Sequence, residues 1–484
     1  MGEFLVFNRL FNVLIVEDDD ELSGMIEHIF QSKCTQVNIK KAVSRDAAFE
    51  LLEKEPFFDY VTLDLTIPNI DYSFEKDAAN GMAVLGRITE ISSGTPVLIL
   101  TGTSTADMIQ DFLDYSNQID IWGTGTSRGT IEHLTKSRFV DLPDKIEKIY
   151  KEFSSTLSVE LLTHSLILPI EHDRLLRVFI NSQKGCLGDI RQIGGGLSRA
   201  KVYSVHIKDS SGGTIHRAIC KCGPKDDINS DAQNYKDYIN RLRPDATPRL
   251  LGHLKHAAGN MSGVFYGLAE NYDESFFNTS LQNNLNDDLE SAIKCMLDRW
   301  HSNMIQIQKT IGEVRTQLVS DEVANELFIK FELTNAPYFE AKLVNCKVSC
   351  THGDFHGENI LLDITSNKAT LIDYGDVCEG VSILDPLTLE CSFLFHPSTQ
   401  DMLSGWPTQK NLANWEDIDI YVEGCPFSRS IRFCREWAIN IGVGNRELAA
   451  CLYSYALRQL KYQNTNKEYA LSLIESAYRL YEMS

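Results

Sequence analysis

The chain has 484 residues, of which 43% are hydrophobic and 23% are charged, so it can form two or three globular domains. Its net charge of −21 disfavours nucleic acid and anionic membranes as partners, and residues 1–150 alone hold 25 acidic against 13 basic side chains. No apolar run is long enough to cross a membrane, the N-terminus lacks a signal-peptide pattern, and the 12 cysteines form no paired CxxC motifs. We therefore expect a cytoplasmic protein that binds neither nucleic acid nor membrane.

Strand and helix patterns alternate from residue 12 to residue 150. Apolar strand-like runs occur at 13–16, 37–43, 60–65, 96–101 and 131–135. Amphipathic helical patterns separate them, at 21–30, 46–53, 81–91 and from about 140. Strands that alternate with helices indicate a doubly wound α/β domain with a five-stranded parallel sheet.

Several of these strands end in polar residues that suit phosphate chemistry. Glu17 and Asp18 follow the first strand, Asp64 lies at the end of the third, Thr101 ends the fourth and Lys136 follows the fifth. The carboxyl ends of parallel strands meet at one edge of a sheet, which is where such sheets bind ligands. Clustered acids favour Mg²⁺, and an aspartate beside Mg²⁺ and lysine can act as a nucleophile toward a phosphoryl group.

These five residues, in this order, resemble the receiver domain of two-component response regulators. The resemblance implies that Asp64 is the phospho-acceptor and that Glu17, Asp18 and Asp64 hold Mg²⁺. It also implies that Thr101 and Lys136 bind the phosphoryl group and transmit the change. The implied phosphodonor is a sensor histidine kinase, and a homodimer is compatible with the family.

The chain departs from the family after Thr101. Ser137 follows the lysine where the family usually has proline, and His133 occupies the position of an aromatic switch residue. The stretch 122–130, WGTGTSRGT, lacks the context of a phosphate-binding loop, and we interpret it as a flexible insertion. These departures leave the phosphorylation chemistry intact but put the usual output surface in doubt.

The pattern changes in the rest of the chain. Residues 151–187 are predicted to be a helical connector. From about 188, the runs GDIRQI, KVYSVHIK and IHRAICKC indicate an antiparallel sheet, with DSSGG as a hairpin turn. Helical patterns then dominate at 285–318, 320–332, 385–395 and 427–482. We expect a sheet-rich lobe at about 188–272 and a helical lobe at about 273–484.

Two features of the predicted sheet-rich lobe suit nucleotide phosphates. The turn formed by Gly194, Gly195, Gly196 and Ser198 can present backbone N–H groups and a hydroxyl. Lys221 lies in the apolar run AICKC, where a lysine requires an anionic partner. Neither feature is specific by itself.

The stretch THGDFHGENILL (351–362) and the later LIDYG (371–375) supply the remaining chemistry. The strands NILLDI and KATLIDY are predicted to form a hairpin that returns Asp373 close to Asn359. Asn359 and Asp373 then offer oxygen ligands to Mg²⁺, while Asp354 can accept a proton from a hydroxyl. The alternative, a metallohydrolase with His352 and His356 as ligands, leaves the lysine and the glycine turn unexplained.

HGDFHGENIL followed by LIDYGD resembles the aminoglycoside phosphotransferase and choline kinase-like branch of the kinase fold, over residues 188–484. The resemblance implies an α+β bilobal domain that binds ATP and Mg²⁺. It makes Asp354 the catalytic base, gives the metal to Asn359 and Asp373, and leaves the histidines as structural supports. The further implied roles are phosphate binding by Lys221 with Asp231 as its partner, adenine binding around Glu270 and Tyr272, and support of the catalytic loop by Asp385 and Glu390.

Together these features predict a two-component output protein with the domains 1–150, 151–187 and 188–484. Its expected activity is ATP-dependent phosphoryl transfer to a hydroxyl of a small molecule or a protein, controlled by the receiver. The alternative is a catalytically inactive scaffold that binds ATP. The acceptor stays open, because the acids Glu416, Asp417 and Glu423 suit either a cationic acceptor or a solvated face.

Overall fold

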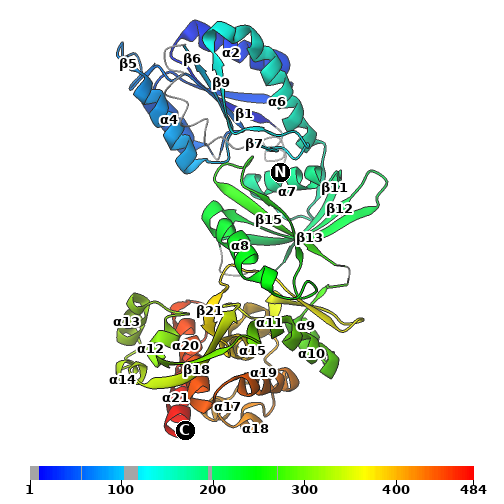
Figure 1. Cartoon of the computed structure of the whole chain (residues 1–484), viewed down its shortest axis with the longest axis vertical. Coiled ribbons are helices and arrows are strands. Elements are labelled where there is room, and N and C mark those ends of the chain that lie inside the picture. Colours follow the sequence, from blue (N-terminus) through cyan, green and yellow to red (C-terminus); the bar gives the residue numbers. More distant parts are fainter. Residues whose placement is uncertain (1–9, 56, 103–117, 194–198, 270) are drawn as a thin grey trace. The chain divides into compact units, whose positions relative to one another are not determined.

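A computed structural model describes residues 10–55, 57–102, 118–193, 199–269 and 271–484 (Figure 1). Internal contacts divide the chain into two compact units. The first unit consists of residues 1–229 and 250–268, and the second of residues 230–249 and 269–484. This division differs from the predicted boundaries at 150 and 187, because contacts join the first sheet to the second. Among the described residues, no helix combines the length and apolarity needed to span a membrane.

The first unit begins with a five-stranded parallel sheet in the order β2-β1-β3-β6-β9, as predicted. Side chains that alternate along β1 enter two separate apolar layers. Phe11, Val13 and Ile15 pack with α2 and α6 on one face, while Leu14 and Val16 pack with α3 and α4 on the other. The strands are β1 (Phe11–Val16), β2 (Val37–Ala42), β3 (Tyr60–Leu63), β6 (Val97–Thr101) and β9 (Ile131–Thr135), and the helices are α2 (Asp20–Lys33), α3 (Arg45–Lys54), α4 (Ala78–Ile91) and α6 (Leu142–Leu157).

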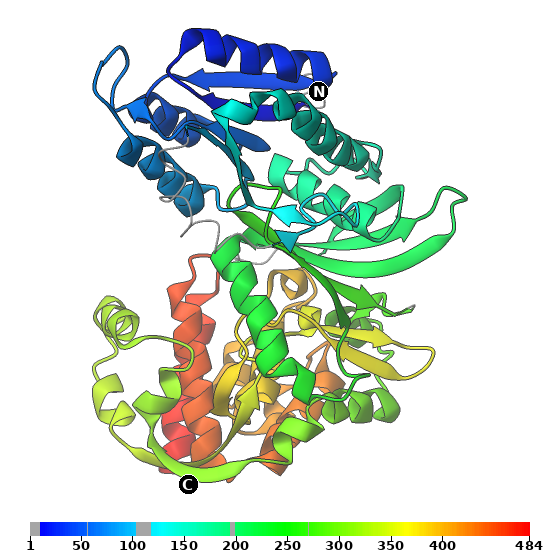
Figure 2. The same cartoon turned by 45° about the horizontal axis from the view of Figure 1, so that its top comes forward.

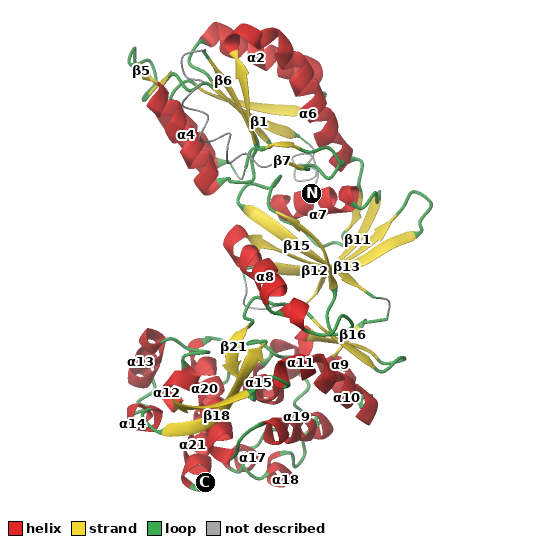
Figure 3. Ribbon diagram, viewed as in Figure 1, coloured by secondary structure: helices red, strands yellow, loops and turns green. Residues whose placement is uncertain are grey.

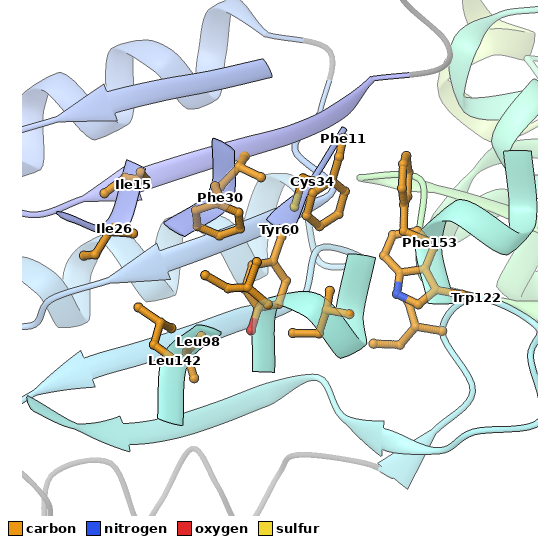
Figure 4. Packing of buried hydrophobic residues seen from close by; sticks show 14 of the residues in the cluster. Phe11, Ile15, Ile26, Phe30, Cys34, Tyr60, Leu98, Trp122, Leu142 and Phe153 are labelled. Atoms are coloured by element: carbon orange, nitrogen blue, oxygen red, sulfur yellow. The ribbon is translucent and has the colours of Figure 1, made fainter. Parts of the chain in front are cut away.

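The segment 118–130 is anchored in this domain. Two short strands, β7 (Gln118–Ile119) and β8 (Arg128–Gly129), pair with each other. Trp122 is fully buried beside Phe153 (Figure 4), and Arg128 forms buried hydrogen bonds of 2.7 and 3.0 Å to Glu152. The expectation of a flexible insertion is therefore wrong at Trp122 and Arg128, because burial of an indole and of an ion pair fixes both positions.

The first unit also contains a six-stranded sheet in the order β10-β11-β12-β13-β15-β14. The three predicted strands and their hairpin are confirmed, since β11, β12 and β13 are antiparallel neighbours. The connector is not wholly helical, because β10 lies within it and pairs with β11. The bounds are β10 (Glu160–Leu162), α7 (Ile170–Ser182), β11 (Leu187–Ile193), β12 (Lys201–Lys208), β13 (Thr214–Pro224), β14 (Arg249–Leu254) and β15 (Met261–Leu268), with α8 (Lys225–Asp237) running into the second unit.

Helix α7 links the two sheets of the first unit. Its Phe179 stacks on Phe265 of β15, with ring centroids 3.7 Å apart. On the side of the parallel sheet, Arg174 forms a buried ion pair with Asp59, which precedes β3. The backbone of Gly94 also exchanges hydrogen bonds with the loop before β15, 2.9 Å from its N–H to Gly259 O and 3.0 Å from Ala257 N–H to its carbonyl. The first sheet is thus packed against the second rather than tethered to it.

The second unit is mainly helical, as expected (Figure 3). Helix α15 (Leu384–Phe395) is buried along its whole length, and α20 (Asn445–Lys461) and α21 (Lys467–Glu482) run side by side (Figure 2). Its other helices are α9 (Phe276–Leu281), α10 (Asp287–Met296), α11 (Asp298–His301), α12 (Ile311–Arg315), α13 (Asp321–Lys330), α14 (Ala336–Glu340), α16 (Pro397–Gln400), α17 (Gln409–Ala413), α18 (Ile418–Tyr421) and α19 (Ser428–Ile441).

Two small sheets carry the catalytic-loop candidate of this unit. One has the order β16-β19-β20 and the other β17-β18-β21. The prediction that residues 285–318 are mostly helical does not hold at β17, where the alternating sequence IQIQKT forms a strand that pairs with β18. The bounds are β16 (Glu274–Ser275), β17 (Ile305–Thr310), β18 (Leu343–Thr351), β19 (Ile360–Asp363), β20 (Lys368–Leu371) and β21 (Cys378–Val381).

Candidate functional site

The predicted acidic edge is assembled at the carboxyl ends of the parallel strands. Carboxylate oxygens of Glu17, Asp18 and Asp64 lie within 4.8 Å of one another. Glu17 directly follows β1 and Asp64 directly follows β3, two strands that are neighbours in the sheet. Hard oxygen ligands at this spacing fit Mg²⁺, which binds through a few carboxylates together with water or phosphate.

Lys136 neutralises part of this acidic edge. Its Nζ lies 2.6 Å from Asp64 Oδ2 and 3.0 Å from Glu17 Oε2. Loss of water around the ammonium would lower the pKa of Lys136, but the hydrogen bond to Asp64 and the charge of Glu17 raise it instead. Lys136 therefore stays protonated beside the predicted phospho-acceptor, where it can bind an added phosphoryl group.

Within this cluster, burial opposes the ionisation of Glu17. Its side chain is buried, and that burial, together with the charge of Asp64, raises its pKa from 4.5 to about 7. Lys136 offsets only part of this effect. A divalent cation would favour the ionised form of Glu17, so the electrostatics of the edge fit a metal site.

The remaining predicted receiver residues lie where the sequence places them. Thr101 is fully buried at the last position of β6, the strand that pairs with β9 ahead of Lys136. Asp18 forms an ion pair with Lys76, a residue that was not predicted to belong to the site. Lys76 belongs to the long segment after Asp64, and no local signal in the sequence shows that this segment returns to the edge.

The second cluster surrounds Asp354, in the loop between β18 and β19. Asp354 Oδ1 lies 3.1 Å from Arg458 Nη2, and its Oδ2 lies 3.5 Å from His356 Nε2. Loss of water around the carboxylate would raise the pKa of Asp354, but the charges of His356 and Arg458 outweigh this and hold the pKa well below its usual range. Asp354 is therefore ionised at neutral pH.

Asn359 and Asp373 are brought together by the predicted hairpin. β19 and β20 are antiparallel, and Ile372 N–H bonds to the carbonyl of Asn359 at 3.0 Å. The Asn359 amide donates to the carbonyl of Asp354 at 2.9 Å, which leaves Oδ1 of the amide as an acceptor. Asp373 has a φ of +63°, a conformation that is uncommon outside glycine and is often found at functional sites.

Buried supports hold this loop in place. Asp385 accepts the N–H groups of His352 at 2.8 Å and Gly353 at 3.2 Å. Gly353 has a φ of +79°, and a side chain there would meet the carbonyl of Asp376 at 2.3 Å. The second implied acid, Glu390, forms a buried bidentate pair with Arg435.

The two histidines act as framework within this loop. His352 is buried and its Nε2 lies 3.2 Å from the carbonyl of Ile372, which links the loop to the hairpin. His356 lies between Asp354 and the Asn359 amide, 3.2 Å from the amide nitrogen. A metallohydrolase centre built on these two histidines finds no support among the described residues, where the one group of metal-ligand side chains is the acidic edge of the first unit.

Asp231, proposed from the sequence as the partner of Lys221, bonds to the hairpin within the second unit. Its Oδ2 accepts the N–H of Tyr374 at 3.2 Å. Asn234, one turn later on α8, donates to the carbonyls of Tyr374 and Gly375 at 2.9 and 3.0 Å. These contacts, and the contact of Arg458 with Asp354, were not predictable from the sequence, because each joins residues more than 100 positions apart.

The predicted nucleotide-binding residues are only partly described. Gly194, Gly195, Gly196, Ser198 and Glu270 lie outside the described residues. Lys221 is buried on β13, opposite Val202 of β12 and Val264 of β15, while Tyr272 is buried in the second unit. Their assignment to ATP remains a prediction from the sequence.

Comparison with known proteins identifies the first sheet. Residues 13–118 match the family model of the response regulator receiver domain. Similar solved structures include a signal receiver domain from Colwellia psychrerythraea (23% identity, 29% of this chain, 98% of that chain, TM-score 0.22) and an adenylate cyclase from Rhodopirellula baltica (17% identity, 31% of this chain, 93% of that chain, TM-score 0.23). A third is the Mn²⁺-bound form of response regulator Rcp1 (20% identity, 33% of this chain, 98% of that chain, TM-score 0.22).

A search of curated proteins finds no match. The family match and the five-stranded parallel sheet with its acidic edge agree with each other. Residues 13–118 are therefore a response regulator receiver domain, which indicates two-component signalling and implies a phosphodonor such as a histidine kinase.

Proposed function

We propose that the second unit transfers a phosphoryl group from ATP to a hydroxyl group, under the control of the receiver domain. The observation that carries the proposal is the grouping of an ionised Asp354 with Asn359 and Asp373 on one strand–loop–hairpin element. Phosphoryl transfer depends mainly on positioning and charge neutralisation, and these residue types provide both. The fold proposed for this activity is the bilobal one of the aminoglycoside phosphotransferase and choline kinase-like family.

Each side chain has a distinct role in this proposal. Asp354 orients the acceptor hydroxyl and takes its proton, since it is ionised and lies at the loop surface with 37% of its side chain exposed. Asn359 and Asp373 would hold Mg²⁺, which when bound supplies positive charge to the phosphates of ATP. The sequence further assigns ATP contacts to Lys221, the glycine turn at 194–196 and Ser198.

The proposed control begins at Asp64. In the unphosphorylated receiver, Asp64 forms its 2.6 Å ion pair with Lys136 at the start of the segment that leads into α6. A phosphoryl group on Asp64 would form the ion pair with Lys136 in place of the Asp64 carboxylate. Helix α6 is followed by α7, which packs on both sheets of the first unit. We propose that phosphorylation shifts the population of unit 1 conformations and thereby the activity.

The test of the proposed activity is ADP release by the full chain with Mg²⁺ and ATP, in the presence of lysate metabolites and proteins. Wild type and the surface control Asp401→Asn should both release ADP, whereas Asp354→Ala should lose turnover by a factor of about 10² or more while still binding ATP. Equal turnover by wild type and Asp354→Ala would remove Asp354 from the mechanism and contradict the proposal.

A second candidate function is an ATP-binding signalling scaffold without catalysis. The contact of Arg458 with Asp354 favours it, because an arginine that holds the base competes with an incoming hydroxyl. This candidate predicts that wild type binds ATP but releases no ADP with any acceptor, before or after receiver phosphorylation. The same ADP assay therefore separates the two functions.

A further inference from the structure

A cavity of about 610 Å³ lies in the second unit, beside the sheet β17-β18-β21. Its walls come from β17, β18, β21, the α11 region and the segment after α8. Three cationic side chains line it, Arg241, Arg299 and Lys309, against the single acid Glu379. This local excess of positive charge contrasts with the chain's net charge of −21.

These two arginines and the lysine differ from most other arginines of this unit in their partners. Within the described part of the chain, none of them lies within 4 Å of a carboxylate, whereas Arg315, Arg435 and Arg458 each pair with an acid. The Arg299 guanidinium donates to the carbonyl of Leu242 at 3.2 Å. Three cations against one acid on a concave wall raise the local concentration of anionic ligands.

A neutral donor also lines the cavity, beside the buried side chain of Trp300. Gln317 accepts the N–H of Val381 through Oε1 at 3.1 Å, so its amide NH₂ is the group available to a ligand. Donors without matching acceptors fit a ligand that carries oxygen anions.

The cavity lies on the strands that lead into the catalytic loop. Cys350 of β18 and Glu379 of β21 are paired across the sheet and both line the cavity. Asp354 follows Cys350 by four residues, so their Cα atoms are at most about 14 Å apart. A small molecule anchored among the cations would have to span this distance to bring a hydroxyl to Asp354.

We infer that this cavity binds the phosphate acceptor, and that the acceptor is a small molecule with both a hydroxyl and an anionic group, either phosphate or carboxylate. The inference rests on the proposed kinase function. In the reaction, the acceptor O–H bond breaks and its proton passes to Asp354. A bond forms between that oxygen and the γ-phosphorus of ATP, while the bond from this phosphorus to the β–γ bridging oxygen breaks and ADP leaves. Arg241, Arg299 and Lys309 hold the anionic group and take no part in the chemistry.

The test compares four probes of similar size on the full chain: glycerol 3-phosphate, glycerate, glycerol and choline. Calorimetry should detect binding of at least one of the two anions at millimolar concentration and of neither glycerol nor choline. The variant Arg299→Gln/Lys309→Gln should weaken anion binding about tenfold or more. The matched control Lys330→Gln/Lys461→Gln removes two other cations and should bind as wild type does. Circular dichroism and thermal melting confirm that both variants fold.

The outcomes separate the inference from the function on which it rests. Anion binding that the cavity variant loses, without ADP release, supports the site and contradicts the kinase proposal. ADP release with glycerol or choline that the cavity variant does not reduce supports the kinase and overturns the inference. Failure of both anions to bind, or unchanged anion binding in the cavity variant, also overturns it.

Discussion

The acidic edge of the receiver and the Asp354 loop both gather carboxylates, but they treat the charge in opposite ways. At the edge, burial and the neighbouring Asp64 raise the pKa of Glu17 to about 7, and Lys136 only partly compensates. In the loop, His356 and Arg458 hold the pKa of Asp354 well below its usual range. In the first cluster, Lys136 offsets only part of the effect of burial on Glu17. In the second cluster, His356 and Arg458 outweigh the effect of burial on Asp354.

The difference indicates which added ions or groups suit each cluster. The edge fits a divalent cation and an incoming phosphoryl group, each of which interacts with Glu17, Asp64 or Lys136. The loop keeps one carboxylate permanently ionised, which a base requires, and presents Asn359 and Asp373 separately for a metal. One chain thus uses similar residue types for phosphoryl acceptance and for proposed phosphoryl transfer.

The largest expected effect is the loss of receiver phosphorylation. Asp64→Asn should abolish phosphorylation by acetyl phosphate and Mg²⁺, because the amide is not a nucleophile toward phosphorus. Phosphate-affinity gel electrophoresis measures the phosphorylated fraction. Glu50→Gln, at an exposed position on α3, should be phosphorylated as wild type is. Equal phosphorylation of Asp64→Asn would contradict the assignment of Asp64.

Two buried ion pairs, one in each unit, offer the next largest effect. Arg174→Ala leaves Asp59 buried without its cation, and Arg435→Ala does the same to Glu390. Each should lower the free energy of unfolding by about 3–5 kcal/mol, because an unpaired buried charge is strongly unfavourable. Urea unfolding measures this, with Arg138→Ala as an exposed control. A loss below about 1 kcal/mol in either variant would show that the buried acid is not held by its arginine.

The pKa of Glu17 predicts a pH dependence that the Asp354 loop should not share. Mg²⁺ must displace the proton of Glu17, so Mg²⁺ affinity of the receiver should be about tenfold weaker at pH 6 than at pH 8. Without Mg²⁺, the raised pKa makes the free energy of unfolding fall as the pH rises from 4.5 to 7. Tryptophan fluorescence or calorimetry measures the affinity. Glu17→Gln should bind Mg²⁺ equally at both pH values, and the same affinity in wild type at pH 6 and 8 would contradict this account.

The smallest expected effect concerns the pKa of Asp354 in the loop. Arg458→Gln removes one of the positive groups that, after His356, depress the pKa of Asp354, so the acidic limb of the proposed turnover should move to higher pH. The pH profile of ADP release measures this shift, and Arg446→Gln, on the same helix, serves as the control. An unchanged acidic limb would show that Arg458 does not tune Asp354.

Much of this picture was predictable from the sequence, because it is encoded locally. Strand ends fixed the positions of Glu17, Asp64, Thr101 and Lys136, since parallel strands share one edge. The hairpin between Asn359 and Asp373 was likewise predictable from two apolar runs around a short turn.

The contacts that escaped prediction are long-range or depend on packing. Arg458 reaches Asp354 across 104 residues, and Arg174 reaches Asp59 across 115. Nothing in the local sequence around either arginine names its partner. Strand β17 was not predicted, because its alternating pattern is short and is flanked by helices.

The most direct test of the central claim is the rate of ADP release by the full chain before and after acetyl phosphate treatment, with an acceptor fraction present. We predict that the wild-type rate changes about fivefold or more on phosphorylation, that the Asp64→Asn rate does not change, and that Asp354→Ala has no turnover in either state. A wild-type rate that is the same in both receiver states would contradict control by the receiver, and turnover that survives in Asp354→Ala would contradict the kinase itself.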